Sequence, residues 1–148
     1  MHRLMWWAMA AGAIGFARPL GAQAAMASPW NPATAKWSPS GPGMEASTVF
    51  GDPAGAGVYT LALRLKGGAW IDPHSHPKTK QVIVIKGVLL MGHGDTVEPA
   101  RAESVGAGQV VVVEAGTVHY EGARGETVIL LSGEGPLVTN WVRPPRKP

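Results

Sequence analysis

Three histidines stand at spacings that suit the binding of a metal ion. His74 and His76 are two residues apart in the stretch HSHPKTKQ (residues 74–81), and on a β-strand such residues point to the same side. His119 follows a strongly apolar run and a short turn, which can place it opposite them inside a barrel. Three neutral imidazoles suit Zn, Fe, Ni, Cu or Mn and leave coordination positions open for water or a substrate. The pattern therefore predicts a divalent metal site with open positions.

The runs around these histidines have the pattern of short β-strands. Residues 58–66 alternate large apolar side chains with smaller or polar ones, which is typical of a half-buried strand. No stretch carries a convincing helical period, and Gly, Pro, Asp or Ser separates nearly all of the apolar runs. The sequence therefore predicts an all-β domain, either a sandwich or a small closed barrel. The further strands expected are residues 81–85, 88–91, 109–113, 127–131 and 137–142.

Two segments resemble the two sequence motifs of the cupin superfamily. GAWIDPHSHPKTKQVIVIKG (residues 68–87) is similar to the first motif, and GQVVVVEAGTVH (residues 108–119) is similar to the second. The resemblance covers residues 45–142, and its end, GETVILLSGEGPLVTNWVRPP, resembles a group of small exported bacterial single-domain cupins. It implies a single jelly-roll-like barrel, the double-stranded β-helix. It also implies a divalent metal, such as Fe, Mn, Zn or Ni, held by three histidines and a glutamate.

The chain departs from the cupin pattern at two positions. Glu114 stands where the second motif has proline, which alters a turn and leaves the ligands alone. Lys80 stands where the first motif has its glutamate, and a protonated lysine cannot ligate a cation. Three outcomes keep the metal: Lys80 swings outward, Gln81 offers an amide oxygen at a local bulge, or the histidines hold the ion alone. The fourth outcome is a barrel without metal, with Lys80 in the vacancy. The predicted ligand set is His74, His76, Gln81 and His119.

No catalytic residue is assigned from the sequence. Tyr120, Glu114 and Glu121 are candidate acid–base groups near the motifs. Strand parity is taken to place Tyr120 and Glu121 beside His119 rather than with it, so we interpret these candidates as solvated or turn residues. The other conspicuous side chains are expected to be structural: His93 at a surface hairpin, and Trp70 and Trp141 in barrel packing.

The N-terminal residues have the three-part layout of a secretory signal peptide. A weakly basic start is followed by the uncharged apolar run LMWWAMAAGAIGFA (residues 4–17), and small residues suit cleavage after Ala24 or Ala27. The apolar run is short for a membrane span. We therefore expect a signal peptide over residues 1–24 and a periplasmic or secreted mature protein with no stable membrane span.

The rest of the chain divides into three further segments. A proline-rich linker or arm is expected over residues 25–44, the barrel domain over residues 45–143 and a basic proline-rich tail over residues 144–148. Trp30 and Trp37 are expected to anchor the arm onto the domain surface or onto a partner subunit, which would make the protein a homodimer.

Composition excludes several classes of site and partner. The chain has no cysteine, so disulfides and thiolate metal ligands are excluded. Its net charge of +3 comes from the termini, since residues 45–142 carry seven basic and ten acidic residues. No basic stripe interleaved with aromatic residues is present, so nucleic acid is not an expected partner.

Two classes of function remain. The first is an exported metalloenzyme, a dioxygenase, isomerase or lyase of the cupin type, that acts on a small oxygenated or anionic organic molecule. The second is a non-catalytic cupin that binds a small ligand as a sensor, with a weakened or absent metal site. A lesser alternative is a metal-free barrel that acts through its edges, with the arm exchanged across a dimer. Fold alone does not choose among them.

Overall fold

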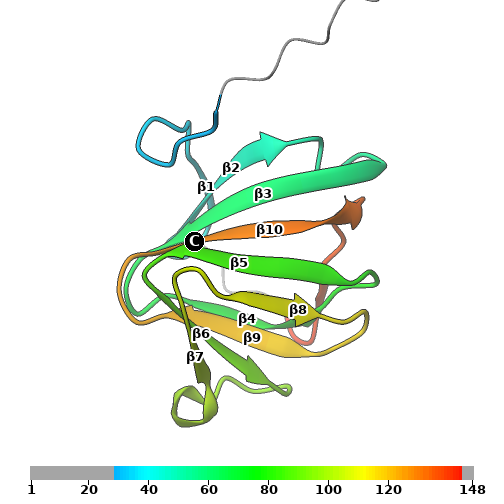
Figure 1. Ribbon diagram of the computed structural model, residues 1–148. Coiled ribbons are helices and arrows are strands. Elements are labelled where there is room, and N and C mark those ends of the chain that lie inside the picture. The colour runs from blue at the N-terminus through cyan, green and yellow to red at the C-terminus, as the bar shows by residue number, and fades with distance from the viewer. Residues whose placement is uncertain (1–28, 145–148) are drawn as a thin grey trace, which may run out of the picture.

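Two antiparallel sheets face each other and enclose the interior of the domain (Figure 1). The computed structural model describes residues 29–144, so the predicted signal peptide and most of the predicted tail lie outside the described residues. Apart from one 3-10 turn, η1 (Pro99–Arg101), the described secondary structure is all β, which confirms the predicted fold class. No helix in residues 29–144 is long and apolar enough to cross a membrane.

The first sheet has six strands. Their order is β1-β2-β3-β10-β5-β8, and every neighbouring pair is antiparallel. The bounds are β1 (Ser38–Gly41), β2 (Met44–Phe50), β3 (Gly57–Leu65), β10 (Thr127–Gly135), β5 (Lys80–Lys86) and β8 (Val110–Val113).

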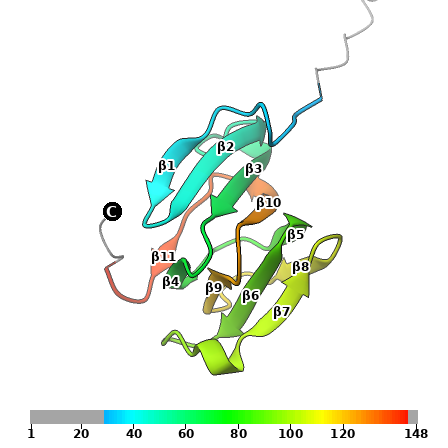
Figure 2. The ribbon, with the colours of Figure 1, turned by 90° about the vertical axis from the view of Figure 1, so that its left-hand side faces the viewer.

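The second sheet has five strands in the order β11-β4-β9-β6-β7, again all antiparallel (Figure 2). The bounds are β11 (Asn140–Trp141), β4 (Trp70–Ser75), β9 (His119–Ala123), β6 (Val88–His93) and β7 (Glu103–Gly106).

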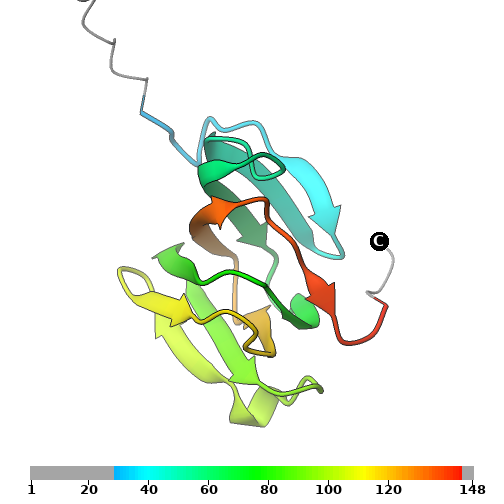
Figure 3. The ribbon, with the colours of Figure 1, turned by 90° about the vertical axis from the view of Figure 1, so that its right-hand side faces the viewer.

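The chain passes repeatedly from one sheet to the other. From β3 to β6 each successive strand lies in the opposite sheet, and from β7 to β11 it changes sheet at every step. Figure 3 shows the last of these crossings, the orange-to-red segment that leaves β10 and ends in β11. Gly87, with φ of 78°, makes the turn from β5 to β6, a backbone conformation that favours glycine. This alternation is what brings residues far apart in sequence into one interior.

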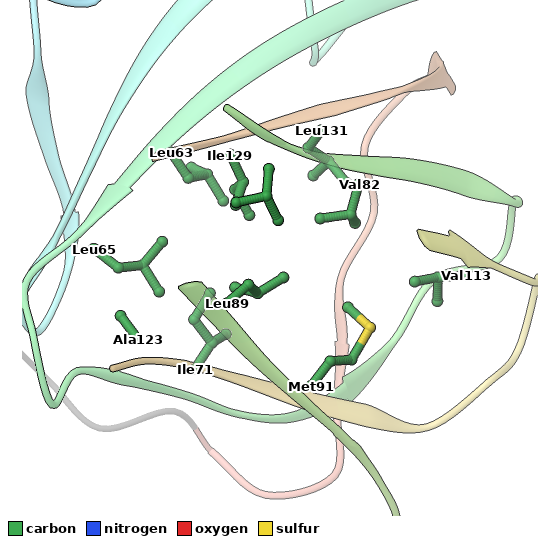
Figure 4. Packing of buried hydrophobic residues seen from close by; sticks show 11 residues of the cluster. Leu63, Leu65, Ile71, Val82, Leu89, Met91, Val113, Ala123, Ile129 and Leu131 are labelled. Carbon is green, nitrogen blue, oxygen red and sulfur yellow. The ribbon is translucent and has the colours of Figure 1, made fainter. Parts of the chain in front are cut away.

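The core lies between the sheets because each strand places alternate side chains inward. Figure 4 shows apolar side chains from both sheets pointing toward one another. On β3, the predicted period of two is confirmed: Tyr59, Leu63 and Leu65 are buried. The buried cluster consists of Leu63, Leu65, Ile71, Val82, Val84, Leu89, Met91, Val113, Ala123, Ile129 and Leu131.

The predicted arm is partly a packed element. Residues 38–41 form β1, and β2 begins at Met44, so the first sheet extends into the segment that we expected to be a linker. Proline is tolerated there because β1 is an edge strand. The expected anchoring onto the domain is confirmed: Trp30 donates a hydrogen bond to the Ser47 hydroxyl at 3.4 Å, and Trp37 lies 4.5 Å beneath the Arg64 guanidinium.

Other strand predictions hold in part. The strand expected over residues 137–142 is wrong except at β11, since residues 136–139 form no strand. Besides β1 and β2, the sequence did not predict β4, β7 and β9, whose short polar or glycine-containing runs lack a clear alternation. Two of these missed strands, β4 and β9, carry histidines of the predicted site.

Candidate metal centre and its cavity

The three predicted histidines lie together inside the barrel. His74 on β4 and His119 on β9 are register partners, and their ring centroids are 4.3 Å apart. His76 follows directly after β4 and has the same strand parity as His74, with a centroid separation of 4.9 Å. All three side chains are buried, and one ring nitrogen from each lies within 4.8 Å of the others. Neighbouring strands of one sheet therefore bring together residues that are 45 positions apart in sequence.

Backbone hydrogen bonds fix the orientation of each imidazole. The Nδ1–H of His74 donates to the Asp72 carbonyl at 2.8 Å, and that of His119 donates to the Thr117 carbonyl at 2.9 Å. The Nδ1–H of His76 donates to the Val138 carbonyl at 2.7 Å, across 62 residues of sequence. A ring that donates through Nδ1 keeps its lone pair on Nε2 when it is neutral. The residues flanking the cluster thus select the tautomer that metal binding needs.

Burial keeps His74 and His76 neutral. Together with the smaller effects of the nearby Lys80 and His119, it lowers the pKa of His76 from 6.5 to about 4, although the hydrogen bond to the Val138 carbonyl acts in the opposite direction. The pKa of His74 is also lowered, mainly by burial, while the Glu121 carboxylate works in the opposite direction. Both imidazoles are therefore uncharged at neutral pH, so no proton has to be removed before they ligate.

These features fit a divalent first-row transition metal. Three imidazole nitrogens lie within 4.8 Å of one another, and each ring is held by a backbone carbonyl through its Nδ1, as is usual for metal-binding histidines. His74, His76 and His119 would hold such an ion through their Nε2 atoms.

Lys80 points into the barrel rather than away from it. It is the first residue of β5, and its side chain is 1% exposed. Its ammonium donates a hydrogen bond to the Tyr59 hydroxyl at 2.9 Å. Of the outcomes left open by the sequence, the outward swing of Lys80 is therefore excluded. Strand parity is the reason, since Lys80 shares the inner face of β5 with Val82 and Val84.

Gln81 lies on the outer face and does not join the cluster. Its side chain is exposed, and the pairing of β5 with β10 is regular from Lys80 to Val84. The only shift in that pairing falls at the other end of the strand, between Val128 and Ile129. The local bulge that would have turned Gln81 inward is absent. The prediction of Gln81 as the fourth ligand is therefore wrong, and the cluster consists of the three histidines.

Glu121 occupies the interior, contrary to the interpretation as a solvated residue. It lies two positions after His119 on β9, which gives both side chains the same orientation. Glu121 is buried, and its Oε1 lies 4.0 Å from His119 Nε2. Among the residues lining the cavity in the described part of the chain it is the sole carboxylate. The spacing of two residues between His119 and Glu121 was the sequence signal for the inward orientation of Glu121.

The other candidate residues do not enter the cluster. Glu114 is exposed, as interpreted, and His93 is exposed at the end of β6. Tyr120 is buried on the other face of β9 and donates to the Glu98 carbonyl at 3.0 Å. Trp70 packs near the Tyr120 ring. Trp141 packs beside His74, with ring centroids 5.1 Å apart, and borders the cavity.

A mainly apolar cavity of about 150 Å³ extends from the histidines. Its polar side chains are those of the cluster, Glu121, Lys80, Ser40 and Thr139. Apolar residues from both sheets and from the segment between β10 and β11 form the rest of the wall: Met44, Leu61, Leu63, Ile71, Val82, Val113, Ile129, Leu131, Leu137 and Trp141.

Comparison with known proteins agrees with this architecture. Residues 27–138 match the family described as the ChrR cupin-like domain. The chain belongs to this cupin family. The resemblance seen in the two motifs is thereby confirmed at the level of the family, together with the cupin or jelly-roll fold.

Two curated plant proteins are similar to this cupin over part of their length. One is the germin-like protein subfamily T member 3 of Arabidopsis thaliana, 35% identical over 74 residues, which are 49% of this chain and 32% of that protein. The other is the germin-like protein 1-1 of Oryza sativa subsp. japonica, 33% identical over 94 residues, which are 60% of this chain and 42% of that protein. The match thus spans less than half the length of either relative.

Solved structures resemble the cupin in fold. The polyketide cyclase RemF of Streptomyces resistomycificus superimposes with a TM-score of 0.64 at 17% identity, over 80% of this chain and 87% of that one. An RmlC-like cupin of Shewanella frigidimarina gives 0.57 at 12% identity, over 70% and 86%. The Rhodobacter sphaeroides complex of SigE with the anti-sigma ChrR gives 0.56 at 17% identity, over 70% and 51%.

Proposed function

We propose that this protein is an exported cupin that holds a divalent metal through His74, His76 and His119 and acts on a small anionic organic molecule. The observation that carries the metal site is the set of three Nδ1–H donations to backbone carbonyls, which leave three Nε2 lone pairs around one point. A bound divalent ion would supply Lewis acidity and open positions for an oxygen ligand.

The residues around the cluster prepare it for such chemistry. Glu121 brings a negative charge to within 4.0 Å of His119 Nε2, which partly offsets the charge of a divalent ion. It also provides a proton acceptor beside the open positions, in a cavity whose wall is mainly apolar. The chemistry that fits this set of groups is proton abstraction or oxygen-dependent cleavage of a small oxygenated compound.

A non-catalytic sensor is the second candidate. Lys80 favours it, because the residue in the glutamate position of the cupin motif is here a buried cation that opposes metal binding. One of the structural neighbours comes from a complex with the anti-sigma ChrR, which is a regulatory protein. A ligand that binds the metal-loaded protein and is recovered without chemical change would favour this candidate.

The metal site is tested by measuring metal content. The mature protein is purified without added chelator and analysed by plasma mass spectrometry, beside His119→Ala and the control His93→Ala, which removes an exposed histidine. We expect near-stoichiometric metal in the parent and in His93→Ala, and a loss of at least tenfold in His119→Ala. Equal, sub-stoichiometric metal in all three proteins would refute the site.

Export is proposed from the sequence of the N-terminal segment. The apolar run of residues 4–17 and the small residues before Ala24 and Ala27 support a cleaved signal peptide. Fractionation of a bacterial host followed by N-terminal sequencing tests it. We expect periplasmic protein that begins after Ala24 or Ala27, and an intact N-terminus in the cytoplasmic fraction would contradict it.

A further inference from the structure

Lys80 is a buried amine without an acidic partner in residues 29–144, and burial, together with the charge of Lys78, lowers its pKa. Its side chain is 1% exposed and lines the cavity together with the three histidines. Its hydrogen bond in the described part of the chain goes to the neutral Tyr59 hydroxyl, and no carboxylate of residues 29–144 forms an ion pair with it. Burying an unpaired charged side chain costs free energy of folding. Such side chains are found at binding sites, where a ligand supplies the opposite charge.

Sheet register holds this ammonium in place. Gly133 of β10 pairs with Lys80 on one side and with Tyr59 on the other, so the three residues form a row across β5, β10 and β3. Tyr59 is fully buried, and its hydroxyl accepts from Lys80 while its own O–H stays available as a donor. Gly133 carries no side chain between them. Tyr59 is therefore a positioning residue that orients the Lys80 donors.

The remaining cavity sets the shape of what can approach this cation. Its wall is formed mainly by leucine, isoleucine and valine side chains of both sheets, and its volume is about 150 Å³. A cavity of this size and lining accommodates a benzene ring, as shown by an engineered protein cavity of similar volume. The space therefore fits an apolar body of one six-membered ring with a small polar head.

We propose that Lys80, oriented by Tyr59, binds the anionic head of a ligand whose body is a single apolar ring, such as an aromatic carboxylate or phenolate. This inference rests on the proposed function, because the ligand is the small molecule proposed above. The ammonium–anion contact, however, does not require the metal. It adds a second anchoring point in the cavity, apart from the histidines, and thereby names the substrate class.

The test is calorimetric titration of the chelator-treated protein at pH 7.5 with benzoate and with the neutral analogue benzyl alcohol. The variants are Lys80→Met, Tyr59→Phe and the control Lys86→Met, which removes an exposed lysine of the same strand. Hydrogen bonds to charged groups contribute about 1.5–3 kcal/mol, so we expect Lys80→Met to weaken benzoate binding at least tenfold. Tyr59→Phe should weaken it to a smaller extent, and benzyl alcohol should bind the parent and both variants alike.

Thermal melting separates loss of the site from loss of the fold. Lys80→Met replaces a buried cation with an unbranched apolar side chain, so its melting midpoint should equal or exceed that of the parent. Equal benzoate affinity of the parent and Lys80→Met, or no saturable binding of benzoate by the folded parent, would overturn the inference. Because the metal is removed, neither result bears on the metal site, which is tested by metal content.

Discussion

His119 Nε2 and Glu121 Oε1 lie 4.0 Å apart on the inner face of β9, both buried in the same cavity. The cupin motifs place a metal-binding glutamate on the neighbouring sheet, at the position that Lys80 occupies here. In this chain the interior carboxylate instead comes from the strand that carries the third histidine. A divalent ion at the histidines would thus have a negatively charged neighbour although a lysine stands at the motif position.

Glu121→Gln tests whether this carboxylate supports metal binding. The substitution keeps the size of the side chain and removes its charge, so we expect metal affinity to fall about 10- to 100-fold, as for other groups next to metal ligands. Competition with a fluorescent chelator measures the affinity. Glu114→Gln is the matched control, since Glu114 is exposed and should have no effect. Equal affinities of the two variants would exclude a role for Glu121.

Lys80→Glu tests how the cation in the motif position limits the metal site. It exchanges a buried positive charge for a carboxylate that lines the same cavity as the histidines. We expect metal affinity to rise at least tenfold, again measured by chelator competition. An exchange at the exposed Lys86, Lys86→Glu, should leave affinity unchanged. If Lys80→Glu binds metal no more tightly than the parent, Lys80 does not oppose the ion.

The sequence was sufficient to predict the fold class and the three histidines, for identifiable physical reasons. Strands such as β3 alternate along most of their length, and HxH places two imidazoles on one face whatever the surrounding fold. Gln81 was wrongly predicted as a ligand because the prediction needed a bulge in β5, and the regular pairing of β5 with β10 is a tertiary feature. The strand β1 within the expected arm was not predicted because a proline-rich edge strand has no apolar period.

The Lys80–Tyr59 contact lay beyond what sequence patterns reveal. These residues are 21 positions apart and meet only because β10, from the far end of the chain, lies between their strands. Nothing local to either residue specifies that insertion. The inward orientation of Glu121, in contrast, was predictable from sequence, because residues 119 and 121 of one strand point to the same side.

The pKa of His76 predicts a pH-dependent stability of the metal-free protein. Burial lowers this pKa to about 4 in the folded state, against 6.5 for an exposed imidazole, so between these values the unfolded chain binds more protons. The contribution of His76 to the free energy of unfolding is therefore complete above pH 6.5 and is lost as the pH decreases toward 4. We expect a loss of about 2 kcal/mol between pH 6.5 and 5, where carboxylates contribute little.

Urea unfolding at several pH values measures this dependence. His76→Asn removes one titrating group and should reduce the slope of the curve, although His74, whose pKa is also lowered by burial, still contributes. Removal of the exposed His93 by His93→Asn should leave the slope unchanged. An unfolding free energy of the metal-free parent that stays constant from pH 6.5 to 5 would contradict the prediction.

Gly92 is predicted to be essential for the packing of the second sheet. A methyl group at this position of β6 would overlap the Tyr120 ring on the neighbouring strand β9. Gly92→Ala should therefore lower the free energy of unfolding by about 1–3 kcal/mol, as overpacking commonly does. Gly125→Ala is the control, since a methyl group there meets nothing within 4 Å. Chemical denaturation compares them, and equal stabilities would show that Tyr120 moves aside without cost.

The metal centre is tested most directly by an anomalous-difference map from crystals of the mature protein grown with Zn²⁺ or Mn²⁺. We predict one strong peak in the barrel, about 2.0–2.3 Å from the Nε2 atoms of His74, His76 and His119, with each Nδ1 still donating to its backbone carbonyl. A peak bound through Nδ1, or no peak at the three histidines while others stand elsewhere on the protein, would contradict the proposed centre.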